Sequence, residues 1–494
     1  MRKRLLGLFL ILFSFPSLAN AHVGSKDVFE QTTAGPYQLY VTIRMPNVIP
    51  GSATVEVRST GAPVTGIHLT PVPLTGEASK HPPTSDPMKA SSEDPAFYTA
   101  TIWIMAAGSW QVRFDIAGAA GDKTTSVPVP AAPISTLRMD RTLGAILGVL
   151  GLFLVLSMAG VVAAAIRESR LQPGVQPDAP RRRRALIAMV ASLAFMALLV
   201  YGGAKWWNVE AAGYDENIFR PLQTTATLNG NTLDLTIQPH SSEDTRRIRS
   251  NSDFIPDHGH LMHLYAIRQP GMDAVFHLHP AQTSAGNFRL GLPTMPAGSY
   301  TLYADVVHAS GFPETLVSTL TVPANMPAAT PGPDDASALT QPVGATLLGA
   351  SFRLPDGYTM IWDAPENLTS SIAYIFHFHL LDATGMPAAD MQPYMGMTGH
   401  AAFVKTDGTV FAHVHPEGSA SMAAVMLANP AAQDAMADMP AMTGMSHPPG
   451  IPQSGSANVV EFPYGFPTPG RYRILVQMKH NTTVETGVFD AQVN

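Results

Sequence analysis

Residues 393–416 read PYMGMTGHAAFVKTDGTVFAHVHP, and residues 256–280 read PDHGHLMHLYAIRQPGMDAVFHLHP. Both stretches contain Pro-x-x-Gly-x-x-x-His followed by His-x-His-Pro, so the chain carries a duplicated segment. In the second copy, Asp407-Gly408 lies between two apolar runs and predicts a β-hairpin with a two-residue turn. We therefore expect each copy to form part of an antiparallel sheet.

The turn determines which histidines face each other. If Thr406 pairs with Thr409, His400 lies directly opposite His415, and side chains at i and i+2 share a face of the strand. In the first copy a three-residue loop, 270–272, gives the equivalent pairing. The prediction is two sets of converging imidazoles: His263, His277 and His279 in the first copy, and His400, His413 and His415 in the second.

A fourth ligand is expected further along each copy. Residues 298–308 (GSYTLYADVVH) match residues 470–480 (GRYRILVQMKH), and each stretch ends in histidine. Alternation of side chains along a strand places His308 and His480 on the buried-facing side at the far end. We expect each to complete the metal site of its own copy.

The differences between the copies suggest two kinds of site. His258 and His260 of the first copy stand where the second has Met395 and Met397. Imidazole suits cupric copper or zinc, whereas thioether suits cuprous copper. We expect a divalent ion in the first copy and monovalent copper in the second. The alternative is a shared structural role, in which the histidines hydrogen-bond across the hairpins.

Three apolar segments predict export and membrane insertion. Residues 1–21 have the basic start, apolar centre and Ala-x-Ala end of a signal peptide. Residues 142–166 and 185–204 are each long enough to cross a bilayer. The arginine-rich loop 167–184 between them is expected in the cytoplasm by the positive-inside rule. The protein would thus be a two-pass protein of the bacterial inner membrane with periplasmic N- and C-terminal domains.

Short alternating runs with frequent proline and glycine predict a mainly β protein. We expect three immunoglobulin-like β-sandwich domains, with the two transmembrane helices between the first and the second. The expected order is signal peptide 1–21, β-sandwich 22–135, transmembrane helix 142–166, cytoplasmic loop 167–184, transmembrane helix 185–204, His-rich β-sandwich 208–323, linker 324–343 and His/Met-rich β-sandwich 344–494.

Composition excludes several classes of function. The net charge is −7 and basic residues form no patch on the exported segments, so nucleic acid is not an expected partner. The chain has no cysteine, so a soft-metal site would use histidine and methionine. No nucleophile or acid–base motif is present, and we expect a protein that is not an enzyme.

Several short motifs carry a family resemblance. The sequences HVGS (22–25), AGPY (34–37) and VIPG (48–51) resemble the N-terminal region of exported YtkA-like and FixH-like proteins. HVHP (413–416) and PGRY (469–472) resemble periplasmic β-sandwich modules associated with copper handling. The resemblance implies small sandwiches that serve metal supply, to membrane haem-copper oxidases or to a copper-export system.

Together these observations predict a membrane-anchored periplasmic metal-binding protein, a copper carrier or chaperone with shallow, exchangeable sites. Copper is the expected ion, with zinc as an alternative. The expected partners are metal ions, the inner membrane and a membrane copper transporter or haem-copper oxidase. Two other readings stay open: a copper-dependent redox enzyme, and a structural or interaction β-sandwich without metal.

Overall fold

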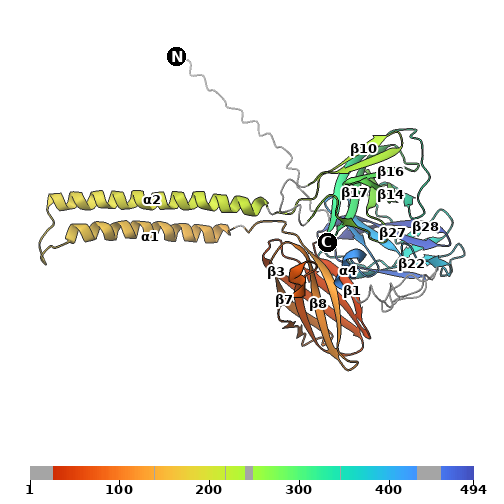
Figure 1. Ribbon diagram of the computed structural model, residues 1–494, viewed down its shortest axis with the longest axis horizontal. Coiled ribbons are helices and arrows are strands. Elements are labelled where there is room, and N and C mark those ends of the chain that lie inside the picture. The colour runs from red at the N-terminus through yellow and green to blue at the C-terminus, as the bar shows by residue number, and fades with distance from the viewer. Residues whose placement is uncertain (1–25, 138, 217, 240–248, 345, 431–457) are drawn as a thin grey trace, which may run out of the picture.

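The computed structural model describes residues 26–494 except 138, 217, 240–248, 345 and 431–457. Antiparallel strands form three units that pack together, and two long helices extend away from them (Figure 1). We call these the N-terminal unit (26–132), the middle unit (224–339) and the C-terminal unit (351–493). The mainly β prediction is confirmed, while the immunoglobulin type of the units stays a prediction. The predicted signal peptide lies outside the described residues.

The N-terminal unit consists of two sheets around one core. One sheet has the order β1 (Val28–Ala34), β2 (Tyr37–Arg44), β3 (Gly51–Gly61), β7 (Phe97–Ile104), β6 (Lys89–Ala90), and the other β5 (Asp86–Pro87), β4 (Val64–Pro73), β8 (Gly108–Gly118), β9 (Lys123–Ala131). A short 3₁₀ helix, η1, spans Glu77–Lys80. Val41 and Val55 of the first sheet meet Phe114 and Val127 of the second in a buried cluster. Alternating apolar residues on each strand supply this core.

The middle unit repeats the two-sheet arrangement. Its outer sheet has the order β10 (Thr224–Asn229), β11 (Thr232–Ile237), β16 (Asn287–Gly291), β15 (Ala281–Ser284). Its inner sheet has the order β12 (Phe254–Ile255), β17 (Gly298–His308), β13 (His263–Gln269), β14 (Ala274–Leu278), β19 (Ala336–Leu339), with β18 (Pro313–Val322) also paired to β17. Strand β19 lies within the predicted 324–343 linker, so part of that segment belongs to the sheet.

The C-terminal unit has the same plan. One sheet has the order β20 (Ser351–Arg353), β21 (Thr359–Trp362), β22 (Tyr374–Leu381), β26 (Val459–Tyr464). The other, its inner sheet, has the order β23 (Met391–Gln392), β27 (Gly470–His480), β24 (His400–Lys405), β25 (Phe411–Val414), with β28 (Thr483–Val493) also paired to β27. Phe376, Phe403 and Ile474 are among the core residues that join the two sheets.

Both predicted hairpin registers are confirmed. Ala402 pairs with His413 across β24 and β25, as the Asp407-Gly408 turn requires. Tyr265 pairs with His277 across β13 and β14, as the three-residue loop 270–272 requires. These registers decide which face of the sheet each histidine occupies, because a slip by one residue would turn every side chain over.

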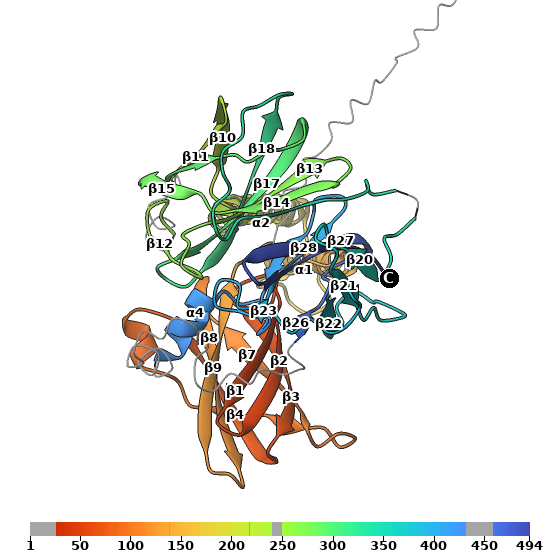
Figure 2. The same cartoon turned by 90° about the vertical axis from the view of Figure 1, so that its right-hand side faces the viewer.

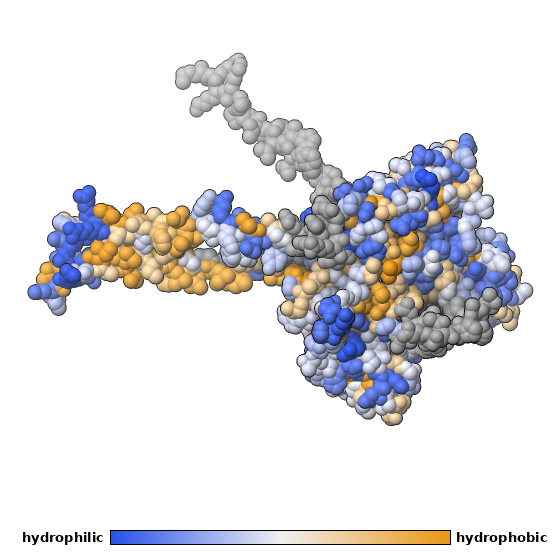
Figure 3. Space-filling model, viewed as in Figure 1, coloured by the Kyte–Doolittle hydropathy of each residue, from blue (hydrophilic) through white to orange (hydrophobic). Residues whose placement is uncertain are grey.

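Helices α1 (Arg141–Glu168) and α2 (Ala179–Glu216) lie side by side and antiparallel (Figure 1). Both are long and apolar enough to cross a membrane, and their apolar side chains face outward along most of the length shown in Figure 3. Helix α2 is longer than the predicted span at both ends. It starts earlier because the side chain of Asp178 accepts a hydrogen bond from the main-chain nitrogen of Arg181 (3.0 Å), which caps the first turn.

The N-terminal unit packs against the segment that follows His415. The main-chain nitrogen of Gln31 donates to the oxygen of Glu417 (2.5 Å), and Ser126 is bridged by the amide of Asn429. Helix α4 (Met422–Ala428) therefore lies against strands of the N-terminal unit, as Figure 2 shows. All three units meet around one region of the molecule.

Candidate metal centre

The inner sheets of the middle and C-terminal units pack face to face. On β13, Leu264 and Ala266 point into the middle unit's own core, whereas Tyr265 and Ile267 point toward the C-terminal unit. The same alternation on β24 sends Ala402 and Val404 toward the middle unit. The two units thus share a second apolar core, and residues of odd number on β13 and even number on β24 face it.

Eight histidines gather at one end of this shared face. Neighbouring rings stand 4.0–6.4 Å apart between centroids, including the pair His263 and His413, which joins the two units at 5.3 Å. The cluster consists of His258, His260, His263, His277, His279, His400, His413 and His415. The sequence predicted two separate sites, one in each domain. The structure instead brings both sets of histidines into a single interface.

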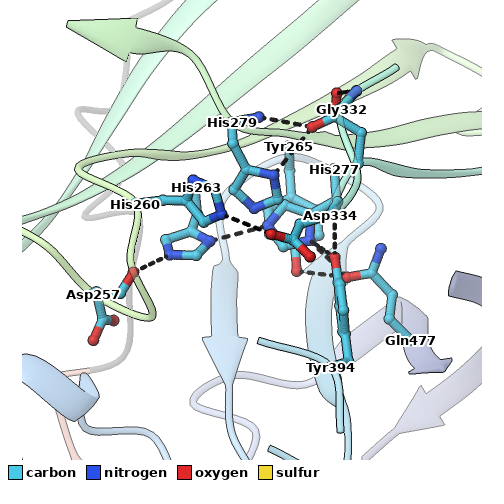
Figure 4. Close-up of polar contacts among 11 residues, drawn as sticks. Asp257, His260, His263, Tyr265, His277, His279, Gly332, Asp334, Tyr394 and Gln477 are labelled. Atoms are coloured by element: carbon cyan, nitrogen blue, oxygen red, sulfur yellow. Dashed lines mark hydrogen bonds and ion pairs between the residues drawn. The ribbon is translucent and has the colours of Figure 1, made fainter. Parts of the chain in front are cut away.

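The first set is the predicted one: His263, His277 and His279, whose ligand nitrogens lie within 4.8 Å of one another (Figure 4). Each ring uses one nitrogen to donate outward. His263 Nε2 donates to the main-chain oxygen of Asp257 (3.0 Å), His277 Nδ1 to Gln477 Oε1 (2.7 Å), and His279 Nδ1 to the Asp335 carboxylate (3.1 Å). The other nitrogen of each ring then carries a lone pair and no proton.

These three bare nitrogens point inward. His263 Nδ1 and His277 Nε2 lie 3.2 Å apart, and His279 Nε2 is buried with no hydrogen-bond partner. Two lone pairs at such a separation repel unless a cation or a proton lies between them. Outward N–H groups held by carbonyl or carboxylate oxygens are the usual support of metal-bound histidines. The arrangement therefore suits a metal ion.

The second set combines histidines of two units. His400 and His415 of the C-terminal unit lie with His258 of the middle unit, and their ligand nitrogens are within 4.8 Å of one another. His258 Nδ1 donates to the main-chain oxygen of Met395 (3.1 Å), and His415 Nδ1 donates to that of Ala420 (3.2 Å). His258 Nε2, His415 Nε2 and both nitrogens of His400 are buried without partners.

His413 and His260 occupy the edges of the two sets. The His413 ring lies 5.4 Å from that of His400, but His258 replaces it among the three converging nitrogens. Its Nδ1 is 3.5 Å from a carboxylate oxygen of Asp305, and its Nε2 is buried and unpartnered. His260 stacks on His279 at 4.0 Å and its Nε2 lies 3.2 Å from Asp334.

The prediction that Met395 and Met397 supply thioether ligands to the second site stays a prediction. Met395 meets the second set through its main-chain oxygen, and Met397 closes a short bridge with Tyr394. The imidazole of His258 crosses from the other unit and joins the second set. Each set therefore contains three imidazoles.

The expectation that His308 and His480 are fourth ligands is wrong. His263 pairs with Asp305 and His400 with Gln477, so odd-numbered residues of β17 and β27 share the histidine face. His308 and His480 have even numbers and project from the opposite face, which covers each unit's own core. The sequence correctly indicated a buried side, but that side belongs to the other face of the sheet.

His308 and His480 make ion pairs of their own. His308 lies between Asp253 (2.7 Å) and Glu314 (2.9 Å), and Arg249 also pairs with Glu314 (3.0 Å). Although burial opposes it, these carboxylates raise the pKa of His308. His480 lies 2.8 Å from Asp356, and together with Glu485 they form a mixed histidine and carboxylate group.

Burial sets the charge of the main cluster. His400 is 0%, His277 1%, His263 2% and His415 3% exposed, which contradicts the expectation of shallow sites. Burial lowers the pKa of seven of the eight, and neighbouring rings add to the effect for most of them: His258, His263, His277, His279, His400, His413 and His415. These rings are therefore neutral at pH 7, the form that binds metal.

Several supporting residues were missed from the sequence. Asp334 and Asp335 reach His260 and His279 from the predicted linker, because pairing of β19 with β14 draws this segment onto the sheet. Gln477 holds His277 from the other unit, and Tyr394 donates to the main-chain oxygen of Asp334 (2.7 Å). The one available clue was the position of Gln477, three residues before His480 and on the opposite strand face.

Comparison with known proteins gives little further guidance. No curated protein matches the chain. Solved structures that align include a tetra-tandem repeat from the extending region of a large adhesion protein (8% identity, 94% of this chain and 82% of that chain, TM-score 0.15). A second aligned structure is that of a 1.5-MDa bacterial ice-binding adhesin (6% identity, 90% of this chain and 91% of that chain, TM-score 0.14). A third is dimeric latent PorU from Porphyromonas gingivalis (9% identity, 95% of this chain and 34% of that chain, TM-score 0.15).

TM-scores this low establish no shared fold, so these likenesses support no inference about the chain. The match in sequence is more specific. Residues 222–324 and 353–494, which contain all eight histidines of the cluster, match the family described as a domain of unknown function, DUF8832.

Proposed function

We propose that this chain is a membrane-anchored metalloprotein whose middle and C-terminal units together hold two metal ions, one in each three-histidine set. The observation that carries the proposal is the group of buried imidazole nitrogens without a partner: His279 Nε2 in the first set, and His258 Nε2, His415 Nε2 and both nitrogens of His400 in the second. His263 Nδ1 and His277 Nε2 add to it, because they face each other at 3.2 Å while the other nitrogen of each ring donates outward. A buried polar atom without a partner costs about 1–3 kcal/mol. Bonds to metal ions would remove that cost at several positions at once.

Copper is the ion that we propose, with zinc as the alternative. Both sets offer three neutral imidazoles, and cupric copper binds nitrogen ligands more tightly than the other divalent ions of its row. The chain has no cysteine to favour an all-thiolate zinc site. Two cations also balance a cluster in which Asp257, Asp305, Asp334 and Asp335 lie close by.

The burial of the ligands bears on the role. A carrier exchanges its ion with a partner, which is easiest when ligands lie at the surface, whereas these rings lie between two packed sheets. We therefore favour a resident copper centre in an exported, two-pass inner-membrane protein, with both β-rich parts in the periplasm. Copper delivery to a membrane transporter or haem-copper oxidase is the second candidate, supported by the two helices that would hold the centre at the membrane.

The test is the metal content of the full chain, purified in detergent and loaded with Cu(II), after removal of loose metal. We expect His279→Ala to lose about one ion relative to the wild type, and His415→Ala to lose about one ion from the other set. His379→Ala is the matched control, because His379 pairs with Asp363 away from the cluster. Equal copper content in all four proteins, or none in the wild type, would refute the proposal.

A further inference from the structure

A cavity of about 120 Å³ lies beside the histidine cluster, where the three units meet. Lys26, Pro130 and Ala132 of the N-terminal unit form one side of it, and Asp305 of the middle unit forms another. His413 and His415 of the C-terminal unit and His263 of the middle unit complete the wall toward the metal centre.

The cavity reaches both histidine sets. His263 belongs to the first set and His415 to the second, and both line the same space. His413, which belongs to neither set, also faces the cavity and has a buried, unpartnered Nε2. A molecule in the cavity would thus lie next to both metal ions and one further imidazole.

The volume restricts what can enter. A cavity of about 150 Å³ can hold benzene, and water occupies about 30 Å³ in the liquid, so this smaller space favours a ligand smaller than an aromatic ring. The charge of the wall restricts the ligand further. Asp257, Asp305 and Glu314 outnumber Lys26 among the other titratable lining residues, so the wall itself adds no net positive charge that would attract an anion.

We propose, on the basis of the two-ion centre proposed above, that this cavity admits a small uncharged ligand of two or three heavy atoms, of the size of dioxygen, which binds directly to the metal ions. Each set supplies three imidazoles, which leaves a coordination position open on ions that take four or more ligands. One histidine of each set lines the cavity. A ligand in the cavity would therefore reach the open coordination position of each ion from this side.

Carbon monoxide is a suitable probe, because it is uncharged, has two heavy atoms and binds cuprous copper. The experiment uses the full copper-loaded chain in detergent, reduced with ascorbate, and measures the C–O stretching band by infrared spectroscopy during titration. Ala132→Phe places a ring into the cavity from the N-terminal unit and replaces no metal ligand. Ala132→Leu fills it less, and Ala107→Phe adds the same bulk at an exposed position outside the cavity.

We expect carbon monoxide to bind the wild type and the Ala107→Phe control alike, more weakly to Ala132→Leu, and at least tenfold more weakly to Ala132→Phe, with copper content unchanged in all four. Equal affinity of the copper-replete Ala132 variants and the wild type would overturn the cavity as the entry. A copper-loaded wild type without a C–O band would overturn it as well. Failure of the wild type to hold copper would refute the two-ion centre itself, and with it this inference.

Discussion

The orientation of His277 depends on a residue of the opposite unit. Gln477 Oε1 accepts a hydrogen bond from His277 Nδ1 at 2.7 Å, and this leaves Nε2 bare and aimed at His263. Gln477 is itself held, because its amide nitrogen donates to Thr486 (3.3 Å). A histidine whose outer nitrogen is held in this way cannot flip or change tautomer freely. The C-terminal unit, through Gln477, therefore orients His277 of the middle unit.

Replacing Gln477 with leucine should therefore weaken the first metal set without removing a ligand. Loss of an outer hydrogen-bond partner lowers metal affinity by about 10–100-fold in known sites. Competition with a chelator, measured on the full chain, should show this loss for one copper ion and leave the second within a few-fold of the wild type. Gln492→Leu removes the same side chain from an exposed position of β28 and serves as control. Unchanged affinity in Gln477→Leu would show that this contact does not orient His277.

At the scale of strands, the sequence predicted what depends on local alternation. The Asp407-Gly408 turn and the loop 270–272 correctly gave both registers, and with them the shared face of each hairpin's histidines. It could not predict that His258 joins the set of the other unit, because that contact follows from the packing of two sheets. Asp335 lies in the predicted linker for the same reason. The pairing of β19 with β14, which brings this segment to the sheet, is a long-range contact that leaves no local pattern in the sequence.

Strand β27 also carries the main polar link between the two units. Arg473 is fully buried, pairs with Asp490 (2.9 Å), and donates to the main-chain oxygens of Met272 (2.6 Å) and Gln341 (3.0 Å) in and beside the middle unit. The guanidinium therefore links the end of the β13–β14 hairpin to the opposite sheet. Arg471 contacts the same carboxylate (3.2 Å) and keeps it partly paired.

Arg473→Met should destabilise the interface between the units. Removing one partner of a buried ion pair costs about 3–5 kcal/mol, and the main-chain oxygens of Met272 and Gln341 would lose their donor as well. In urea unfolding of the full chain in detergent, we expect a clearly lower midpoint and weaker binding at both metal sets, since both need the interface. Arg353→Met changes an exposed arginine of β20 and should match the wild type. Equal midpoints would contradict a role of Arg473 in joining the units.

At the scale of the whole molecule, the duplicated units exchange side chains. His258 of the middle unit completes a set of the C-terminal unit, and Tyr394 of the C-terminal unit, which stands where the first copy has Asp257, has its hydroxyl 3.3 Å from His277. The N-terminal unit then covers the remaining side and closes the cavity with Ala132. The histidine cluster is thus a property of the assembled chain, and no single unit contains all eight of its rings.

Assembly buries so many histidines that the metal-free protein should be sensitive to acid. Seven cluster histidines have a lowered pKa in the folded chain, so below about pH 6.5 the unfolded chain takes up protons that the folded chain does not. Burial acts oppositely on four carboxyls: it raises the pKa of Asp305 to about 7, that of Glu30 well above its usual range, and those of Asp27 and Glu485. Counted in full, these four carboxyls offset four of the seven histidines, which leaves a net of at least about three protons (7 − 4).

Each net proton lowers the free energy of unfolding by about 1.4 kcal/mol per pH unit once the unfolded histidines are protonated. His308 has a raised pKa, so its contribution is complete below pH 6.5 and is lost only as the pH rises, which does not reverse the trend. The melting temperature of the metal-free full chain should therefore fall by at least about 5 °C between pH 7.5 and 5.5. His415→Gln should show a shallower fall, and His377→Gln, at a half-exposed ring outside the cluster, should follow the wild type. A melting temperature that stays level or rises on acidification would mean that the cluster histidines are already protonated in the folded chain. That outcome would contradict the neutral imidazoles that metal binding requires.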